Sequence, residues 1–258
     1  MDEKFADYLL RKTEADYDRM ASDFSVTRAF PWEEMKVLVD QYVETGDRIL
    51  DAGCGNGRLY ELLKNKNVTY EGIDASQPLI DIARRRYGAR FSRHNLIDLS
   101  GLADHSFSLI FCVATFQHIP GRKYRLAVLK NFHRLLVPQG YLLMINWNIL
   151  HQEKFRPYLQ KSNGLFRKGN FDAGDFLYPW KTTAEPIYRY YHGFDEAELA
   201  SLLGQSGFEL EEQYYARHGQ RASAETGYNI ITAGRKISNN QFPESGKAGR
   251  PDSGASAA

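Results

Sequence analysis

Short apolar segments alternate with helical segments from residue 48 to residue 147, and this alternation restricts the fold more than any other feature. Strands that are apolar on both faces and separated by helices are typical of a parallel sheet with helices on both sides. The sequence therefore predicts an α/β fold. The expected strands are at 48–52, 69–74, 90–94, 107–113 and 141–147, with helices at 57–66, 77–87 and 122–136 and a turn at 137–140.

The two ends of the chain complete this pattern. Residues 1–22 suit a short amphipathic helix, and a second helix is expected from Pro31 to about Gly46, since proline favours the first turn. Later in the chain, a helix is expected at 195–205 and strands at 208–215 and 228–235. The prediction is a mostly parallel, seven-stranded sheet with helices on both faces, formed by one domain over residues 1–237.

Residues 148–190 interrupt the alternation. They are rich in aromatic, basic, Gly and Pro residues and show no clean period. A long irregular stretch inside a domain is usually a functional insertion, so 148–192 is interpreted as a lid on the substrate side. The Gly- and Ser-rich tail at 238–258 is expected to be disordered.

The composition excludes several classes of protein. A chain of 258 residues, 43% hydrophobic, can bury one sizeable core. Its net charge of +1 does not favour a polyelectrolyte partner, although such a total can hide a basic face. Two cysteines, Cys54 and Cys112, cannot form a disulfide framework or a Cys-rich zinc site, and no metal site is predicted. Without an apolar signal or membrane segment, the chain is expected in the cytoplasm, with no membrane partner.

The run Asp51-Ala-Gly-Cys-Gly-Asn-Gly57 follows the first strand and is the candidate ligand-binding turn. Glycines let the backbone approach a ligand closely and adopt positive φ, and open α/β sheets bind ligands at the carboxyl ends of their strands. The dinucleotide alternative requires Gly-x-Gly-x-x-Gly, whereas Gly53, Gly55 and Gly57 are evenly spaced. An acid before the glycines would repel a pyrophosphate, but it suits the ammonium group of S-adenosylmethionine.

Further candidates for cofactor binding follow the next strands. Asp74 ends the second strand, where a carboxylate accepts both ribose hydroxyls, in nicotinamide enzymes as well as methyltransferases. Asn95 and Leu96 follow the third strand, where the adenine is expected. Val113 at the end of the fourth strand and Tyr17 near the N-terminus complete the predicted set.

Strings outside this loop carry a more specific resemblance. They are Phe24-Ser-x-Thr-Arg28-x-x-Pro-Trp32, Gln117-His118, Trp147, Pro179-Trp-Lys181 and Arg189-Tyr-Tyr-His192. From about Tyr17 to Lys236 the chain resembles the class I methyltransferases that esterify wobble 5-carboxymethyluridine in tRNA, including the methyltransferase domain of the AlkB-homologue type. Gln117 stands where that family commonly has a second histidine, and Asn148 follows Trp147 where it usually has alanine. These departures leave the cofactor chemistry intact, but they bear on the identity of the nucleobase substrate.

The resemblance implies S-adenosylmethionine as cofactor, tRNA as acceptor and a small zinc-binding activator as a possible partner. A carboxylate acceptor is ionised at neutral pH and needs no general base, only groups that orient it. The candidates for that role are Arg28, His118, Arg189 and His192, with Trp147, Trp180, Lys181 and Tyr190 as substrate contacts. Each has a structural alternative: His118 as a core residue, and Trp147 as packing at a strand end.

Other functions remain open at this point. A small-molecule methyltransferase with 148–192 as its lid is the first alternative, followed by a non-catalytic cofactor-binding subunit and a nicotinamide-dependent oxidoreductase. The arginine run 84–86, with Arg90 and Arg93, is interpreted either as an RNA phosphate contact or as a solvated helix face.

Overall fold

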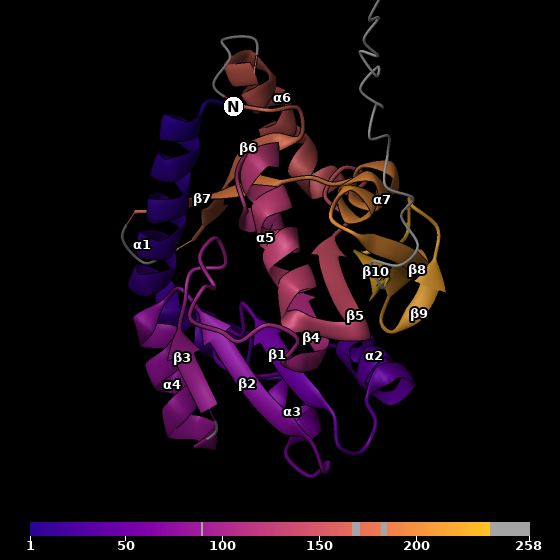
Figure 1. Cartoon of the computed structure of the whole chain (residues 1–258). Coiled ribbons are helices and arrows are strands. Elements are labelled where there is room, and N and C mark those ends of the chain that lie inside the picture. The colour runs from indigo at the N-terminus through magenta and orange to yellow at the C-terminus, as the bar shows by residue number, and fades with distance from the viewer. Residues whose placement is uncertain (89, 167–170, 182–184, 238–258) are drawn as a thin grey trace, which may run out of the picture.

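A computed structural model describes residues 1–88, 90–166, 171–181 and 185–237 (Figure 1). The predicted disorder of 238–258 concerns residues outside these ranges. None of the helices in the described part of the chain combines the length and the apolar character needed to cross a bilayer.

A single large sheet forms the centre of the molecule, in the order β3-β2-β1-β4-β5-β10-β8-β9. Neighbours from β3 to β5 are parallel, and β10, β8 and β9 are added antiparallel. This confirms the predicted α/β, mostly parallel fold with helices on both faces; the three-residue β9 extends the seven expected strands. The strands are β1 (Arg48–Ala52), β2 (Thr69–Asp74), β3 (Arg90–Arg93), β4 (Phe107–Val113), β5 (Leu136–Trp147), β8 (Phe208–Arg217), β9 (Gln220–Ala222) and β10 (Asn229–Lys236).

Two apolar clusters, one on each face, fix the helices to the sheet. On one face Val128, Leu129 and Phe132 of α5 (Arg122–Leu135) pack beside residues of α7 (Glu196–Gln205). On the other face, Leu38 of α2 (Glu33–Tyr42) and Ile80 of α4 (Gln77–Tyr87) belong to the second cluster. Helix α3 (Tyr60–Leu63) also contributes to it. Because β1 and β4 contribute to both clusters, the central strands are covered on both sides, as their apolar sequence predicts.

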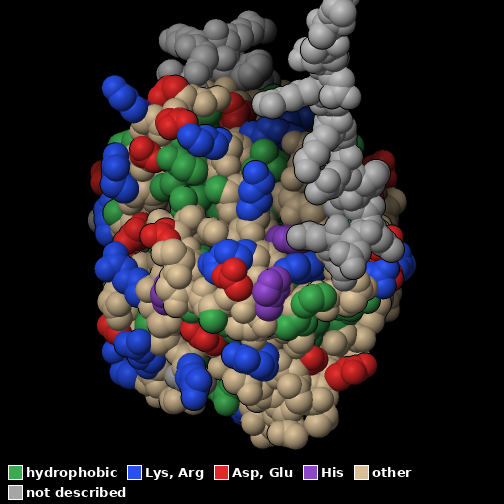
Figure 2. All heavy atoms as spheres, in the orientation of Figure 1, with side chains coloured by type: hydrophobic (Ala, Val, Ile, Leu, Met, Phe, Trp, Pro, Cys, Tyr) green, Lys and Arg blue, Asp and Glu red, His purple; other side chains and the backbone are tan. Residues whose placement is uncertain are grey.

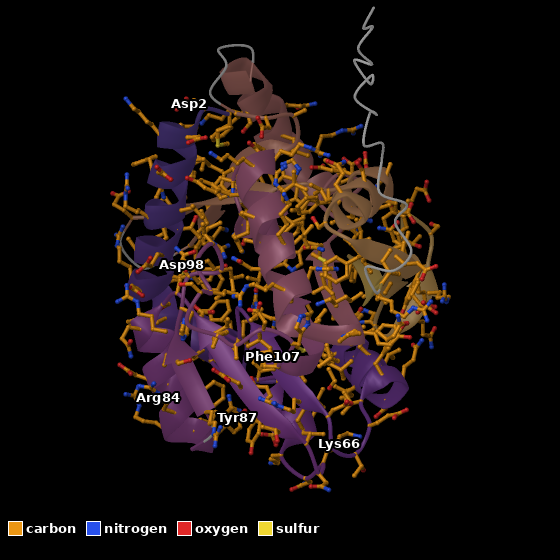
Figure 3. All side chains as sticks on the ribbon, viewed as in Figure 1. Asp2, Lys66, Arg84, Tyr87, Asp98 and Phe107 are labelled. Carbon is orange, nitrogen blue, oxygen red and sulfur yellow. The ribbon has the colours of Figure 1, made fainter. Side chains whose placement is uncertain are left out.

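Helix α1 (Glu3–Thr27) is longer than the predicted helix at 1–22. The side chain of Asp2 accepts the Phe5 N–H at 3.0 Å and caps its first turn (Figure 3). Buried residues continue from Ala6 to Ala21, so a stripe of core contacts supports the helix along most of its length. It lies against α4 and β7 at one side of the molecule (Figure 1).

The inserted segment is regular, which corrects the expectation of an irregular stretch. It contains η2 (Glu153–Phe155), α6 (Arg156–Phe166) and an antiparallel hairpin of β6 (Asp175–Trp180) and β7 (Ile187–His192). Phe176, Tyr190 and Tyr191 are fully buried. Adjacent residues Tyr190 and Tyr191 point to opposite faces of the strand, so both faces are apolar and the alternation that marks a half-buried strand is absent.

Two other predicted boundaries are wrong. The helix after the glycine loop covers only 60–63, because the loop itself continues as turns after Gly57. The predicted turn at 137–140 belongs to β5, which is continuous from Leu136. Gln139 there has a φ of +66°, and the pairing with β4 shifts register nearby. The turn-type residues therefore bend the strand without ending it.

A buried polar cluster fastens the hairpin to the domain. Asp175 of β6 accepts hydrogen bonds from the Tyr190 hydroxyl and from His192 Nδ1, both at 2.6 Å. Arg125 of α5 lies 3.4 Å from Asp175 and 3.1 Å from Glu198 of α7. The side chains of Arg125 and Asp175 are at most 2% exposed, so this ion pair is removed from water. The cluster connects β6 and β7 with both helices of one face.

We expect Asp175→Ala to destabilise the protein by about 3–5 kcal/mol, since it removes the fully buried counter-ion of the Arg125 guanidinium and leaves only the more exposed Glu198. Urea denaturation measures the loss. The control is Glu209→Ala, which breaks the exposed 2.8 Å pair with Arg235 and should change stability by less than about 1 kcal/mol. Equal, small losses in both variants would contradict the role of the cluster.

Candidate active site

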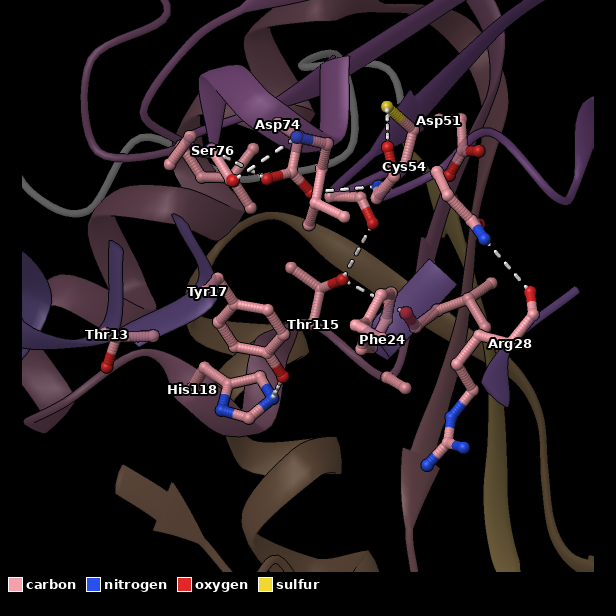
Figure 4. A pocket seen from close by; sticks show the side chains of 18 of the residues that line it. Thr13, Tyr17, Phe24, Arg28, Asp51, Cys54, Asp74, Ser76, Thr115 and His118 are labelled. Carbon is pink, nitrogen blue, oxygen red and sulfur yellow. Dashed lines mark hydrogen bonds between the residues drawn. The ribbon is translucent and has the colours of Figure 1, made fainter. Parts of the chain in front are cut away.

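A pocket lies beyond the carboxyl ends of β1, β2 and β4, walled by α1 on one side and by β7 on another (Figure 4). It brings together most of the predicted site residues, from segments up to 172 residues apart. Those that line it are Tyr17, Arg28, Asp51, Gly53, Gly55, Asp74, Asn95, Leu96, Val113, His118, Trp147 and Arg189.

The glycine loop forms the floor of the pocket. The N–H groups of Gly53 and Cys54 both donate to the Ile73 carbonyl, at 2.8 and 2.9 Å, which ties the loop to β2. Gly53 has a φ of +84°, and a Cβ there would lie 2.2 Å from Thr115 Oγ1. Only glycine fits between β1 and the segment after β4. At Gly55, by contrast, an added Cβ would find its nearest neighbour 3.4 Å away, so the loop leaves space on the pocket side.

Asp51 is the second-last residue of β1; it lies inside the protein and is 2% exposed. Its carboxylate accepts a hydrogen bond from the Tyr70 hydroxyl at 2.8 Å. Burial raises the pKa of Asp51 to about 7, although the Tyr70 hydrogen bond and the charge of Arg58 act to lower it. The buried carboxylate lies beside the pocket and is available to a positively charged ligand group.

Asp74 is held by the backbone on both sides. It accepts the N–H groups of Gly55 and Ser76, each at 2.9 Å, and burial raises its pKa (Figure 4). These bonds orient the carboxylate at the end of β2, where the predicted ribose contact requires it. Asn95 is exposed at the pocket edge, with its amide oxygen accepting the Ile97 N–H at 3.0 Å.

His118, in the 3-10 turn η1 (Phe116–His118), lies in a chain of hydrogen bonds across the pocket. Its Nδ1–H donates to the Tyr190 carbonyl at 2.9 Å, because a carbonyl can only accept, and its Nε2 therefore accepts the Tyr17 hydroxyl at 2.9 Å. Arg189 donates to the oxygen of Tyr17 at 3.4 Å. Burial lowers the pKa of His118 to about 3, so the ring is neutral at physiological pH.

Three arginines face the same pocket. Arg58 and Arg189 are buried, with 7% and 3% exposure, and Arg28 is half-buried. Among the described residues, Arg58 Nη1 and Arg189 Nε have no hydrogen-bond partner. The pocket thus combines the two carboxylates at the strand ends, together with Glu14 of α1, with three guanidinium groups. This donor set and the open glycine cradle fit an adenosine cofactor that carries both an ammonium and a carboxylate group.

A second cleft of about 330 Å³ adjoins this pocket and shares Arg28, Trp147 and Arg189 with it. Its described lining holds four cations and no carboxylate. The cations are Arg28, Lys154, Lys181 and Arg189, and the other lining residues are Trp147, Phe155, Tyr178, Pro179 and Trp180. The Arg189 guanidinium lies 4.9 Å from the Trp180 ring centre, and that of Arg28 lies 5.8 Å from it. Trp147 stacks on Tyr191 and Phe155, so its ring faces are used in packing.

His192 and Tyr190, predicted as catalytic and substrate residues, lie outside both cavities. Their side chains bond to Asp175 in the cluster described above, and only the Tyr190 carbonyl reaches the site, through His118. Adjacent strand residues face opposite sides, so the pocket receives Arg189 and Tyr191 while their neighbours point away. The structure gives His192 and Tyr190 a part in holding the hairpin.

Several pocket residues escaped the sequence prediction. Thr115 packs on Gly53, and Arg58 follows the glycine loop directly. The position of Arg58, immediately after a ligand-binding turn, was the available signal. Lys154 had none, because its place in the cleft depends on how η2 folds.

Comparison with known proteins supports the same assignment. A methyltransferase-domain family profile matches residues 50–144. A methyltransferase-like protein from Encephalitozoon cuniculi is 29% identical over 75% of this chain and 85% of its own length. The tRNA (carboxymethyluridine(34)-5-O)-methyltransferase ALKBH8 of Macaca fascicularis is 31% identical over 60% of this chain, which spans only 22% of that protein. A ubiquinone biosynthesis O-methyltransferase from Coxiella burnetii is 28% identical over 58% of this chain and 65% of its own.

Solved structures share the fold. A SAM-dependent methyltransferase from Methanosarcina mazei superimposes with a TM-score of 0.64 at 24% identity, over 78% of this chain and 97% of that one. A methyltransferase-like protein from Haloferax volcanii, solved in complex with the Trm112 methyltransferase activator, gives 0.64 at 16% identity, over 89% of this chain and 100% of that one.

The sheet order, the glycine loop with its two acids and these matches define the class of the protein. The chain is an S-adenosylmethionine-dependent methyltransferase with the class I, Rossmann-like fold. The predicted fold, enzyme class and cofactor are confirmed.

We expect the affinity for S-adenosylhomocysteine to fall as the pH drops below about 7, because the predicted ammonium contact requires ionised Asp51, whose pKa burial raises to that value. Isothermal titration calorimetry should show about a tenfold loss per pH unit once Asp51 is mostly protonated. Tyr70→Phe removes a hydrogen bond that lowers this pKa, so its profile should shift to higher pH.

Asp51→Asn serves as the control for this titration. It should bind weakly and show no dependence on pH in this range. A wild-type profile that stays flat between about pH 5 and pH 8 would contradict the predicted role of Asp51.

Proposed function

We propose that this methyltransferase acts on the carboxymethyl group of a modified wobble uridine in tRNA. The observation that carries the proposal is the second cleft, whose described lining offers four cations, several aromatic rings and no carboxylate. Such a cleft suits an unstacked nucleobase that bears an acidic substituent. The matched ALKBH8 proteins of Macaca fascicularis and Mus musculus are named for methylation of carboxymethyluridine, which supports the same acceptor.

In this proposal the cofactor is held by Asp51, Gly53, Gly55, Asp74, Asn95, Leu96, Val113 and Tyr17. When bound, S-adenosylmethionine supplies an activated methyl group. The protein's own part is to exclude water and to place an acceptor oxygen, which gives most of the catalysis in a displacement of this kind.

The protonation state of His118, which lines the cofactor pocket, favours a carboxylate substrate. His118 is neutral, with its Nδ1–H donated to the Tyr190 carbonyl and its Nε2 engaged by Tyr17. Because its pKa is lowered to about 3, it is a poor base at neutral pH. A carboxylate arrives ionised and needs only orientation, which Arg189 and Arg28 supply where the pocket meets the cleft. His118 then acts as a positioning residue that holds Tyr17.

A small molecule is the second candidate acceptor. Figure 2 shows Lys and Arg side chains interleaved with Asp and Glu over the visible face, without one continuous basic surface there. Arg84 and Arg86 of the arginine run, and Arg93 beyond it, each donate to a backbone carbonyl, so these side chains already have partners within the protein. The similarity to a ubiquinone biosynthesis O-methyltransferase fits this candidate.

An activator subunit belongs to the proposal as a partner. The Haloferax volcanii neighbour is solved with the Trm112 activator. Assays of this chain therefore include such a subunit as a separate condition.

We expect label from methyl-labelled S-adenosylmethionine to enter bulk tRNA from cells that lack this modification. Arg189→Met should lower kcat/KM by about 10- to 100-fold, the effect of losing one hydrogen bond to a charged group. Arg48→Met is the matched control, since Arg48 is exposed at the amino end of β1, away from the pocket. If no label enters tRNA with or without activator, while a small carboxylic acid is methylated, the RNA acceptor is wrong.

The pH dependence of turnover gives a second test. At saturating cofactor and substrate, kcat should stay constant from about pH 7 to pH 9, because a carboxylate acceptor and a neutral His118 do not titrate there. A kcat that rises steadily across this range would indicate an acceptor that must lose a proton, such as a phenol.

A further inference from the structure

Arg58 is a buried cation that the fold alone does not explain. It follows the glycine loop directly, lines the cofactor pocket and is 7% exposed. Its Nη1 has no hydrogen-bond partner among the described residues. Burying a charged donor without a partner is costly, so this position calls for an anionic ligand.

Trp32 and Arg28 define the surroundings of this side chain. The guanidinium lies 4.3 Å from the centre of the Trp32 ring, a cation–π contact that fixes its orientation. Burial and the neighbouring charge of Arg28 lower the pKa of Arg58 to about 10, so it remains protonated at neutral pH. Arg58 therefore presents a fixed positive charge to the pocket.

Asp51 lies close enough for its charge to act on Arg58, yet the two form no ion pair within 4.0 Å in the described structure. The Asp51 carboxylate bonds to Tyr70 instead. A cation and an anion that are adjacent but unpaired match a zwitterion, whose ammonium and carboxylate groups sit on one carbon. The amino-acid end of the cofactor has this charge arrangement.

We propose that Arg58 binds the α-carboxylate of the methionine moiety of S-adenosylmethionine, with Trp32 holding the guanidinium in place. Arg28 and Arg189 are left for the acceptor, because both lie within 6 Å of the Trp180 ring centre and line the second cleft. In this proposal Arg58 contacts the methyl donor, and Arg28 and Arg189 contact the methyl acceptor. This inference concerns the donor, so it stands or falls independently of the tRNA proposal.

The test compares two ligands that differ in the amino-acid moiety. S-adenosylhomocysteine carries the carboxylate, whereas 5′-methylthioadenosine keeps the adenosine and thioether but lacks it. By calorimetry, Arg58→Met should lower the affinity for S-adenosylhomocysteine by about 10- to 100-fold, the range for a hydrogen bond to a charged group. It should leave the affinity for 5′-methylthioadenosine unchanged. Retained binding of the second ligand also shows that the pocket is folded.

Two further variants complete the experiment. Arg58→Lys keeps the charge but loses the fixed fork geometry, and it should bind S-adenosylhomocysteine with intermediate affinity. Arg48→Met, which changes an exposed residue at the amino end of β1 away from the pocket, should leave the affinities for both ligands within about threefold, because the effects of distant sites are separable. The proposal is overturned if Arg58→Met weakens the binding of both ligands equally, or if it leaves the affinity for S-adenosylhomocysteine unchanged.

Discussion

The burial of Asp51 at the end of β1 is the constraint on which the rest of the site depends. β1 lies between β2 and β4, so its last carboxylate is enclosed by both neighbouring strands and the loops that follow them. Burial in this environment disfavours a negative charge and raises the pKa of Asp51 to about 7. The Tyr70 hydroxyl offsets part of this, and a cationic ligand group would offset more.

The hairpin of β6 and β7 adds a wall to the pocket at the end of this sheet. The Arg125–Asp175 cluster anchors one face of β7, and the opposite face then delivers Arg189 and Tyr191 to the pocket. His118 connects this hairpin with α1, since it forms hydrogen bonds both to the backbone of β7 and to Tyr17 of α1. A single strand thus carries structural residues on one side and pocket-lining residues on the other.

The core of the fold was predictable because its signals are local. The apolar runs of β1, β2 and β4 gave their bounds correctly, and so did the capped helix α4, which begins after Ser76 and ends at Gly88 with a φ of +60°. The glycine loop and Asp74 followed from their places at strand ends. The hairpin was missed because aromatic residues occupy both of its faces, and His192 was placed in the site because a sequence string does not show which side of a strand each residue faces.

The proposed acceptor comes from the resemblance to a family. The second cleft, which combines cations and aromatic rings beside a pocket with a neutral histidine, gives a physical reason to test it. The most direct test is mass spectrometry of nucleosides from tRNA incubated with the protein and S-adenosylmethionine, with and without an activator subunit. The account predicts that 5-carboxymethyluridine is converted to a methyl ester, which mild alkali cleaves back to the acid. An unchanged nucleoside profile, or a methyl group that resists alkali, would contradict it.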